Sequence, residues 1–406
     1  MSMFAPAEAP RSHLGRYRLL APSAAVKVSP LCLGAMNFGD SWKAGLGECD
    51  KETSFKILDT FYENGGNFID TANAYQNEES EAWLGEWMEK RGVRDEIVMA
   101  TKYTSPYQKH NQSKLQPNYV GNNAKSLRLS VEASLKKLRT DYIDLLYVHW
   151  WDFSTSIEEV MTSLNQLVIA GKVIYLGISD TPAWIVSKAN QCKNPPRPTR
   201  LNTSSHASLT RSPTVARDNG LRPFSVYQGQ WNAARRDFER DIIPMCAAEN
   251  MGLCPWGALG GGAFKTAAQR AELDKSGNPG RQVQPRDIDV AVADVLEKVA
   301  ARRGTIITSV ALAYVMSKFP YVSPIVGGRN VEHLQGNIEA LGLVLSQEDI
   351  DEIESAYDFD LGFPMAFLFR GVKEAHPANS VFLNATARMD YPDLPRPPAH
   401  KSLEEL

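Results

Sequence analysis

The chain has 406 residues, and its 44 Lys and Arg residues against 47 Asp and Glu residues give a formal net charge of -3. This balance, without a long basic run, argues against nucleic acid as a partner. The longest uncharged apolar stretches, such as 306–317, are far shorter than the roughly 18 to 20 residues of a membrane span. The amino terminus has no basic segment followed by an apolar one, and the five scattered cysteines form no CxxC. We therefore expect a cytoplasmic protein with neither a secretory signal nor a membrane partner.

Short β-branched or apolar runs alternate with helix-like segments along most of the chain. The predicted strands are Leu31–Gly39, Asn67–Thr71, Ile97–Tyr103, Ile143–His149, Val173–Ser179, Phe224–Trp231, Gly252–Trp256 and Ser323–Gly327. The predicted helices are Lys51–Asn64, Glu78–Lys90, Asn122–Leu138, Ile157–Ala170, Arg240–Asn250, Val290–Arg303, Thr308–Lys318 and Val331–Leu341. Strands and helices in this alternation predict an α/β fold, a closed (β/α)8 TIM barrel. A doubly wound sheet is the alternative, but Asp40-Ser41-Trp42 follows the first strand where that fold has GxGxxG.

Two segments fall outside this alternation. We expect one domain over 1–406, with a barrel core at about 15–356 and an irregular, Pro-rich C-terminal extension at 357–406. The insertion Gln191–Pro213 is polar and holds four prolines, whereas connections from a helix to the next strand usually have about 2 to 6 residues. We expect it to be mobile, dispensable and on the amino-terminal side of the barrel. It is either a lineage-specific loop or a read-through intron, since Cys192-Lys193 can be encoded TGT-AAG, which contains the splice-donor-like string GTAAG.

Chemistry in such a barrel gathers at the carboxyl ends of the strands. Asp70 shares a strand face with Phe68, Lys102 and His149 end the next two strands on inward faces, and Tyr75 follows Asp70 by five residues. Each residue also has an ordinary structural explanation, because a buried Asp–Lys pair, a strand-end His and a packed Tyr are all common. Their coincidence at one rim favours a catalytic site.

The charges of these residues suggest what they do. An ammonium enclosed in the barrel needs a counter-ion, and Asp70 is the nearest candidate for Lys102. Because an ammonium beside a phenol favours the phenolate, we expect Lys102 to lower the pKa of Tyr75, each unit being about 1.4 kcal/mol. Tyr75 is therefore a candidate proton donor near neutral pH.

A series of motifs runs through about Leu31 to Ala356, in the order FIDTANAY, ATKY, YVHWWD, GISD, YQGQWN, PWGALGGG and GGRNVEHLQGNIEAL. With them the chain resembles the aldo-keto reductases. The motifs YVHWWD, GISDTPAW and FSVYQGQWN are most similar to those of the fungal aryl-alcohol dehydrogenase and norsolorinic acid reductase-like branch. The resemblance implies an NADP-dependent oxidoreductase that transfers hydride between NADPH and an aldehyde or ketone, aromatic or polyketide-derived.

The resemblance also implies a catalytic tetrad of Asp70, Tyr75, Lys102 and His149. Tyr75 would protonate the carbonyl oxygen as hydride arrives from the nicotinamide. Lys102, held by Asp70, would depress the pKa of Tyr75, and His149 would bind and orient the substrate oxygen. No metal is implied, because the cofactor supplies the hydride.

Cofactor-binding positions carry over from the resemblance in the same way. They are Asp70, Ser179, Asp180, Gln228, Trp256, Gly257, Ala258, Leu259, Gly260, Gly261, Gly262, Gly327, Gly328, Arg329, His333 and Asn337. Ser179 and Gln228 match the positions that hold the nicotinamide carboxamide, and Trp256 matches a ring that stacks on the nicotinamide. The glycine-rich loop would let backbone amides approach the pyrophosphate, and Arg329 suits a 2′-phosphate. The sequence differs from the family pattern at two places. Asp180 stands where many members have Asn, and the segment around Arg329 lacks the Lys-Ser found in many reductases.

Aromatic residues near these positions suggest an apolar, aromatic small-molecule substrate, although they also fit simple packing of the barrel mouth. They are Trp42, Trp150, Trp151 and Phe38, with Phe363 and Phe367 from the extension. His149, Trp42 and Trp150 are the predicted substrate contacts. Potassium-channel β subunits share this fold and tetrad, so a non-enzymatic NADPH-sensing subunit is an alternative, and a protein inactivated by the insertion is a third. The sequence does not determine the oligomeric state.

Overall fold

The strands form one closed parallel sheet. The structure, a computed structural model, describes residues 7–191, 221–276, 283–370, 376–391 and 396–397. Within them the sheet has the order β10-β3-β4-β5-β6-β7-β8-β9. Its strands are β3 (Cys32–Gly34), β4 (Phe68–Asp70), β5 (Val98–Tyr103), β6 (Ile143–Val148), β7 (Val173–Ser179), β8 (Phe224–Gln230), β9 (Gly252–Trp256) and β10 (Ile325–Val326). The circle closes at Leu253, which donates its N–H to the Tyr321 carbonyl (2.8 Å) and accepts from the Ser323 N–H (2.9 Å).

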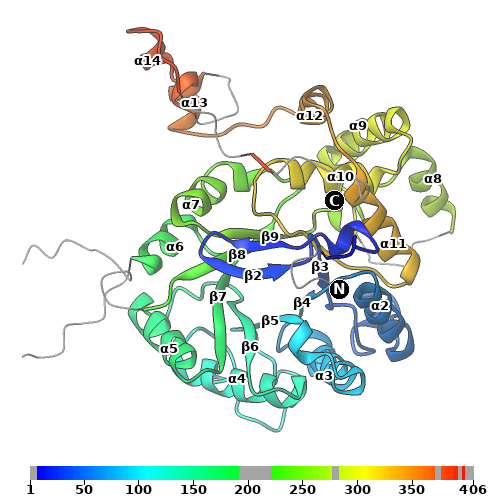
Figure 1. Ribbon diagram of the computed structural model, residues 1–406, viewed down its shortest axis with the longest axis vertical. Helices are drawn as coiled ribbons and strands as arrows, with labels where there is room; N and C mark the ends of the chain where they lie inside the picture. Colours follow the sequence, from blue (N-terminus) through cyan, green and yellow to red (C-terminus); the bar gives the residue numbers. More distant parts are fainter. Residues whose placement is uncertain (1–6, 192–220, 277–282, 371–375, 392–395, 398–406) are drawn as a thin grey trace, which may run out of the picture.

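Helices surround this sheet, as Figure 1 shows, so the predicted TIM barrel is confirmed. They are α2 (Lys51–Glu63), α3 (Glu79–Arg91), α4 (Ala124–Leu138), α5 (Ile157–Ile169), α6 (Ala183–Asn190), α7 (Ile242–Glu249), α9 (Asp287–Arg303), α10 (Ile307–Ser317) and α11 (Val331–Glu339). Local caps determine where several of them begin. Asp50 accepts a hydrogen bond from the Thr53 N–H at α2, and Asn123 accepts one from the Ser126 N–H at α4. Each cap satisfies a backbone donor that has no partner within its helix.

Alternate residues of the strands fill the barrel. Phe68, Val98, Ala100, Leu145 and Tyr147 belong to one buried cluster. This is the inward face that the period-two pattern of these strands predicts. Side chains that continue this face at the carboxyl ends of the strands therefore point into the barrel mouth.

A hairpin that the sequence analysis did not predict covers the other end of the barrel. Its strands are β1 (Arg18–Ala21) and β2 (Ala24–Val28), and Figure 1 shows it laid across the sheet. Four of its side chains, Leu20, Ala21, Ala24 and Val28, are buried in the same cluster as the barrel interior. Its short strands contain several alanines, which have low strand propensity, and this explains why the pattern was missed.

Some predicted boundaries differ from those observed. The first predicted strand, Leu31–Gly39, ends at Gly34, because the chain turns after Ala35, whose carbonyl accepts a hydrogen bond from the Phe38 N–H (3.0 Å). The last, Ser323–Gly327, shrinks to Ile325–Val326. The helices α8 (Ala267–Ser276) and α12 (Gln347–Glu354) were not predicted at all.

The C-terminal extension leaves the barrel after α12. Arg236 and Arg240 hold its beginning, with their guanidinium groups 4.6 and 4.7 Å from the centre of the Phe359 ring. Beyond this point lie the short helices α13 (Met365–Phe369) and α14 (Val381–Asn384), which Figure 1 shows projecting from the barrel.

The helices α9 and α10 meet at an angle of 98°. Together they have the length and composition of a membrane span, whereas no single helix among the described residues does.

The insertion Gln191–Pro213 lies, apart from Gln191, outside the described residues. The elements on either side of it are described. Before it, α6 ends at Asn190, whose side-chain oxygen accepts a hydrogen bond (2.9 Å) from the N–H of Phe224, the first residue of β8. Both flanks therefore lie at the amino-terminal end of the barrel strands.

Candidate active site

Four side chains meet at the carboxyl ends of β4, β5 and β6. Strand pairing sets their height, since Asp70 lies beside Ala100 and Lys102 beside Tyr147. The Lys102 ammonium is fully buried and donates to Asp70 Oδ1 (2.5 Å), to the Thr71 carbonyl (2.7 Å) and to the Tyr75 hydroxyl (3.3 Å). The rings of Tyr75 and His149 meet edge to face with their centres 5.8 Å apart. The structure therefore brings Asp70, Tyr75, Lys102 and His149 into one cluster.

The second oxygen of Asp70 also has a partner. Gln228, near the end of β8 and buried, donates its amide N–H to Asp70 Oδ2 at 2.9 Å. Both carboxylate oxygens are thus held by donors, one of them charged. A carboxylate held at both oxygens keeps the ammonium beside it in place.

Burial and charge set the protonation states of the cluster. Burial alone would lower the pKa of Lys102, but Asp70 and Tyr75 outweigh it and raise that pKa to about 12. The pKa of Tyr75 is raised above its ordinary value, because burial outweighs the opposing effect of Lys102. The expectation of a net lowered pKa is therefore wrong for this structure, although Lys102 does act in the expected direction. Burial and the charge of Lys102 lower the pKa of His149 to about 3, so its imidazole is neutral.

A strained turn holds Tyr75 at the rim. The next three residues, Gln76, Asn77 and Glu78, have φ angles of 53°, 52° and 84°, and such angles cost non-glycine residues on the order of 1–3 kcal/mol each. Gln76 compensates by donating to the Met36 carbonyl (2.9 Å) and accepting from the Trp42 N–H (2.7 Å). Glu78 is held by an ion pair between its Oε2 and Lys137 Nζ, 2.9 Å apart. This support was not predicted, although the polar run after Tyr75 could have indicated it.

His149 is also held from both sides. Its backbone N–H donates to the Tyr103 carbonyl (3.1 Å), which continues the ladder between β5 and β6. Its Nδ1 lies 3.1 Å from Ser105 Oγ, and that oxygen accepts a hydrogen bond from the indole N–H of Trp150 at 3.2 Å. Ser105 is a further residue that the sequence analysis missed, because it lies in the loop after β5 and no motif marks it.

The aromatic residues predicted at the mouth have different positions. Trp42 and Trp150 are half-buried, and the Trp42 ring lies 6.2 Å from that of Tyr75. Phe38 and Trp151 are buried in the two main cores, so they pack the protein.

The suggestion that Phe363 and Phe367 help to line the mouth is wrong. Phe363 is 88% exposed, and Phe367 packs on Phe382 of α14 (ring centres 5.4 Å apart), within the projecting part of the extension. An aromatic composition alone could not show where this segment lies.

Four predicted cofactor-binding residues gather at the ends of β7, β8 and β9. Ser179 lies beside Gln228 in the sheet, and the backbone N–H of Asp180 donates to the Gln228 carbonyl (3.0 Å). The Trp256 indole N–H donates to the Asp180 carboxylate at 3.4 Å. The buried Ser179 hydroxyl lies beside that carboxylate and makes no hydrogen bond of normal geometry in the described part of the chain. It is therefore available to a ligand.

The glycine-rich loop follows β9 directly. Gly257, Gly260, Gly261 and Gly262 have φ angles of 69°, 76°, 60° and 101°, which side chains rarely permit. A Cβ at Gly260 would lie 2.5 Å from the ring of Phe264. Between them Ala258 is buried and Leu259 packs against the core, so the loop presents mainly backbone. Successive backbone amides of this kind can surround an anion.

The last predicted segment lies between β10 and α11. Gly327 and Gly328 follow the strand, Asn337 is buried in the helix, and Asn330 caps that helix by accepting from the His333 N–H (2.9 Å). Arg329 lies against the loop at Gly47, where an added Cβ would be 2.6 Å from its Nη1. Burial and the charge of Arg329 lower the pKa of His333. A helix N-terminus beside an arginine suits a phosphate.

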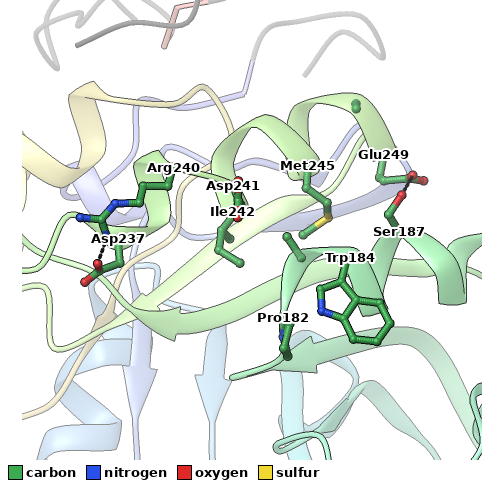
Figure 2. A pocket seen from close by; sticks show the side chains of 11 residues that line it. Pro182, Trp184, Ser187, Asp237, Arg240, Asp241, Ile242, Met245 and Glu249 are labelled. Atoms are coloured by element: carbon green, nitrogen blue, oxygen red, sulfur yellow. Dashed lines mark hydrogen bonds and ion pairs between the residues drawn. The ribbon is translucent and has the colours of Figure 1, made fainter. Parts of the chain in front are cut away.

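A groove of about 620 Å³ lies elsewhere, between α6 and α7 on the outside of the barrel. Figure 2 shows Trp184 and Met245 facing each other across it, and Trp184 is 64% exposed. None of the strand-end residues described above lines this groove, so it is separate from the candidate site.

Comparison with known proteins agrees with this geometry. Residues 30–358 match the model of the aldo/keto reductase family. The chain therefore belongs to that family, and it is an oxidoreductase.

The relatives are fungal enzymes of two kinds. The chain is 57% identical to norsolorinic acid reductase B of Dothistroma septosporum over 374 residues, which cover 90% of this chain and 89% of the relative. It is 51% identical to an aryl-alcohol dehydrogenase of Pestalotiopsis microspora, with 96% and 94% covered. It is 49% identical to the aryl-alcohol dehydrogenase [NADP(+)] of Phanerodontia chrysosporium, with 90% and 91% covered. The resemblance inferred from the motifs is thus confirmed.

Proposed function

We propose that this protein reduces an aldehyde or ketone with NADPH, or runs the reverse oxidation, with Tyr75 as the proton donor. The contact of Lys102 with both Tyr75 and Asp70 carries this proposal. It supplies a fixed positive charge within hydrogen-bond distance of a hydroxyl at the barrel mouth. An oxidoreductase that converts a carbonyl to an alcohol needs such a proton source.

Each member of the cluster has a role in this reaction. When bound, the nicotinamide supplies the hydride to the carbonyl carbon. Tyr75 gives its proton to the carbonyl oxygen, and the ammonium of Lys102 stabilises the phenolate that remains. Asp70 holds Lys102 in place, and the neutral His149 orients the substrate oxygen. The raised pKa of Tyr75 keeps the phenol protonated, as the reductive direction requires.

The residues around the cluster fit a nicotinamide cofactor. The buried Ser179 hydroxyl and Gln228 would hold the carboxamide, and the backbone of 257–262 would face the pyrophosphate. Arg329 would hold a 2′-phosphate, which favours NADP over NAD. The relative named for NADP(+) supports this choice.

The substrate class is proposed from the mouth and from the relatives. Trp42 and Trp150 are half-buried beside the cluster, and flat apolar rings bind aromatic ligands well. The relatives are named for aryl alcohols and for norsolorinic acid. We therefore propose an aromatic carbonyl, simple or polyketide-derived.

A panel assay tests this proposal. The purified chain is incubated with NADPH and a series of aryl aldehydes and aromatic ketones, and the loss of reduced-nicotinamide absorbance is followed. Steady turnover of at least one of them is expected. If NADPH binds tightly but is consumed at most once per chain, the protein is a nucleotide-binding subunit and the proposal is wrong. If NADPH does not bind until 191–213 are removed, the insertion inactivates the protein.

A further inference from the structure

The geometry points to Ser105 as a positioning residue that determines which ring nitrogen of His149 carries the proton. This inference rests on the proposed function, because it concerns the nitrogen that would face the substrate oxygen. Nothing in the motifs marks Ser105, which follows β5 in the loop beside His149.

The donors and acceptors around Ser105 allow the roles to be assigned. The indole N–H of Trp150 can only donate, and it donates to Ser105 Oγ at 3.2 Å. A serine hydroxyl that accepts in this way still has its own hydrogen to give. His149 Nδ1 lies 3.1 Å from the same oxygen. Among the described residues, no other acceptor is hydrogen-bonded to the Ser105 hydroxyl. Ser105 therefore donates to Nδ1.

Because the His149 ring is neutral, the hydrogen bond at Nδ1 determines which ring nitrogen carries the proton. The Lys102 ammonium nearby and the burial of the ring keep the imidazole neutral, and a neutral imidazole has one N–H. If Nδ1 accepts from Ser105, the proton must be on Nε2. His149 can then donate a hydrogen bond to a carbonyl oxygen through Nε2.

The reverse arrangement is unfavourable. With the proton on Nδ1, Ser105 would accept from both Trp150 and His149, and its own hydrogen would have no acceptor among the described residues. Nε2 would then present a lone pair to the carbonyl oxygen and repel it. The backbone bond from His149 to Tyr103 and the edge contact with Tyr75 leave the ring in a defined place.

Nitrogen-15 NMR of the full chain tests the tautomer without any turnover. The protein, labelled at its seven histidines, is compared with the His149→Gln variant to assign the His149 ring. We expect a neutral ring with the proton on Nε2 and a hydrogen-bonded Nδ1. Ser105→Ala should remove the hydrogen-bond shift of Nδ1 and let part of the population carry the proton there, so that the two ring-nitrogen resonances move toward each other, whereas Ser105→Thr, which keeps the hydroxyl, should leave the proton on Nε2. A proton on Nδ1 in the native protein, or equal shifts in the Ala and Thr variants, would overturn the inference.

Kinetics provide the second measurement. Ser105→Ala should lower kcat/KM for the carbonyl about three- to tenfold, the size of one neutral hydrogen bond, without changing the Kd for NADPH. In a His149→Gln background the same substitution should change kcat/KM by less than about twofold, since its effect passes through His149. Equal losses in the two backgrounds would contradict the positioning role. A chain with the expected NMR signature that reduces no carbonyl would contradict the proposed function and leave the tautomer assignment standing.

Discussion

The amide of Gln228 donates to the oxygen of Asp70 that Lys102 leaves free, at 2.9 Å. One carboxylate therefore joins the proposed proton donor, through Lys102, to the proposed nicotinamide site, through Gln228. Because the Asp70 and Gln228 side chains are both buried, neither can move independently of the other. We expect a change at Asp70 to affect both cofactor binding and proton transfer.

Tyr75→Phe should separate these two functions. The ring and its contacts with Trp42 and His149 are kept, so the Kd for NADPH should stay within a few-fold. Turnover should fall by roughly 10² or more, because only the proton donor is lost. Cofactor fluorescence measures the first effect and carbonyl reduction the second. Near-normal turnover by the variant would remove Tyr75 from the mechanism.

Arg329→Ala should weaken NADPH far more than NADH. The guanidinium is the residue proposed to hold the 2′-phosphate, which NADH lacks, and one charge-assisted contact contributes on the order of 1.5–3 kcal/mol. This is checked by measuring the Kd values of NADPH and NADH for the native protein and for the Arg329→Ala variant. Equal weakening of the two would show that Arg329 does not recognise the phosphate.

Asp70→Asn should destabilise the fold strongly. It removes the counter-charge of the fully buried Lys102, and leaving a buried charge unpaired typically costs about 3–5 kcal/mol. Asp237→Asn is the matched control, because the exposed Asp237 pairs with Arg240 at the surface, where such pairs contribute only about 0–1 kcal/mol. Urea unfolding of both variants checks this. Similar small losses for the two would show that Lys102 needs no counter-ion.

The pH dependence of the native protein should show the same ion pair. The pKa of Lys102 is raised in the folded state to about 12, above the roughly 10.4 of an unfolded lysine. Its contribution is therefore complete below the unfolded pKa and is lost as pH rises through the folded one. We expect Asp70→Asn to remove this part of the alkaline loss of stability, as measured by urea unfolding at several alkaline pH values.

The barrel and the strand-end cluster could be predicted because both follow from local patterns. A period of two places Asp70 and Lys102 on the inward faces of neighbouring strands, and strand ends meet at one rim. Ser105 could not be found this way, because it lies in the loop after β5, where the alternation that orients strand residues no longer applies. The direction of the Tyr75 pKa shift could not be predicted from the sequence either, because it depends on how far burial of the phenol outweighs the charge of Lys102. The position of Phe363 could not be predicted for a similar reason, because the hydrophobicity of a residue does not show which part of the protein it contacts.

Excision of the insertion Gln191–Pro213 should keep or raise stability and leave catalysis unchanged. The described flanks of this stretch, Asn190 and Phe224, are hydrogen-bonded to each other at the amino-terminal end of β8. Tyr75 lies at the opposite, carboxyl end of the strands. The flanks are therefore already joined without the insertion, and a shorter connection costs little closure entropy. Urea unfolding and carbonyl turnover of the excised chain check both expectations. Loss of turnover in a chain that still unfolds cooperatively would show that the insertion reaches the site. Sequencing of mature transcripts tests its origin, because a segment retained in every message, with no intron boundary in the gene, would be a true loop.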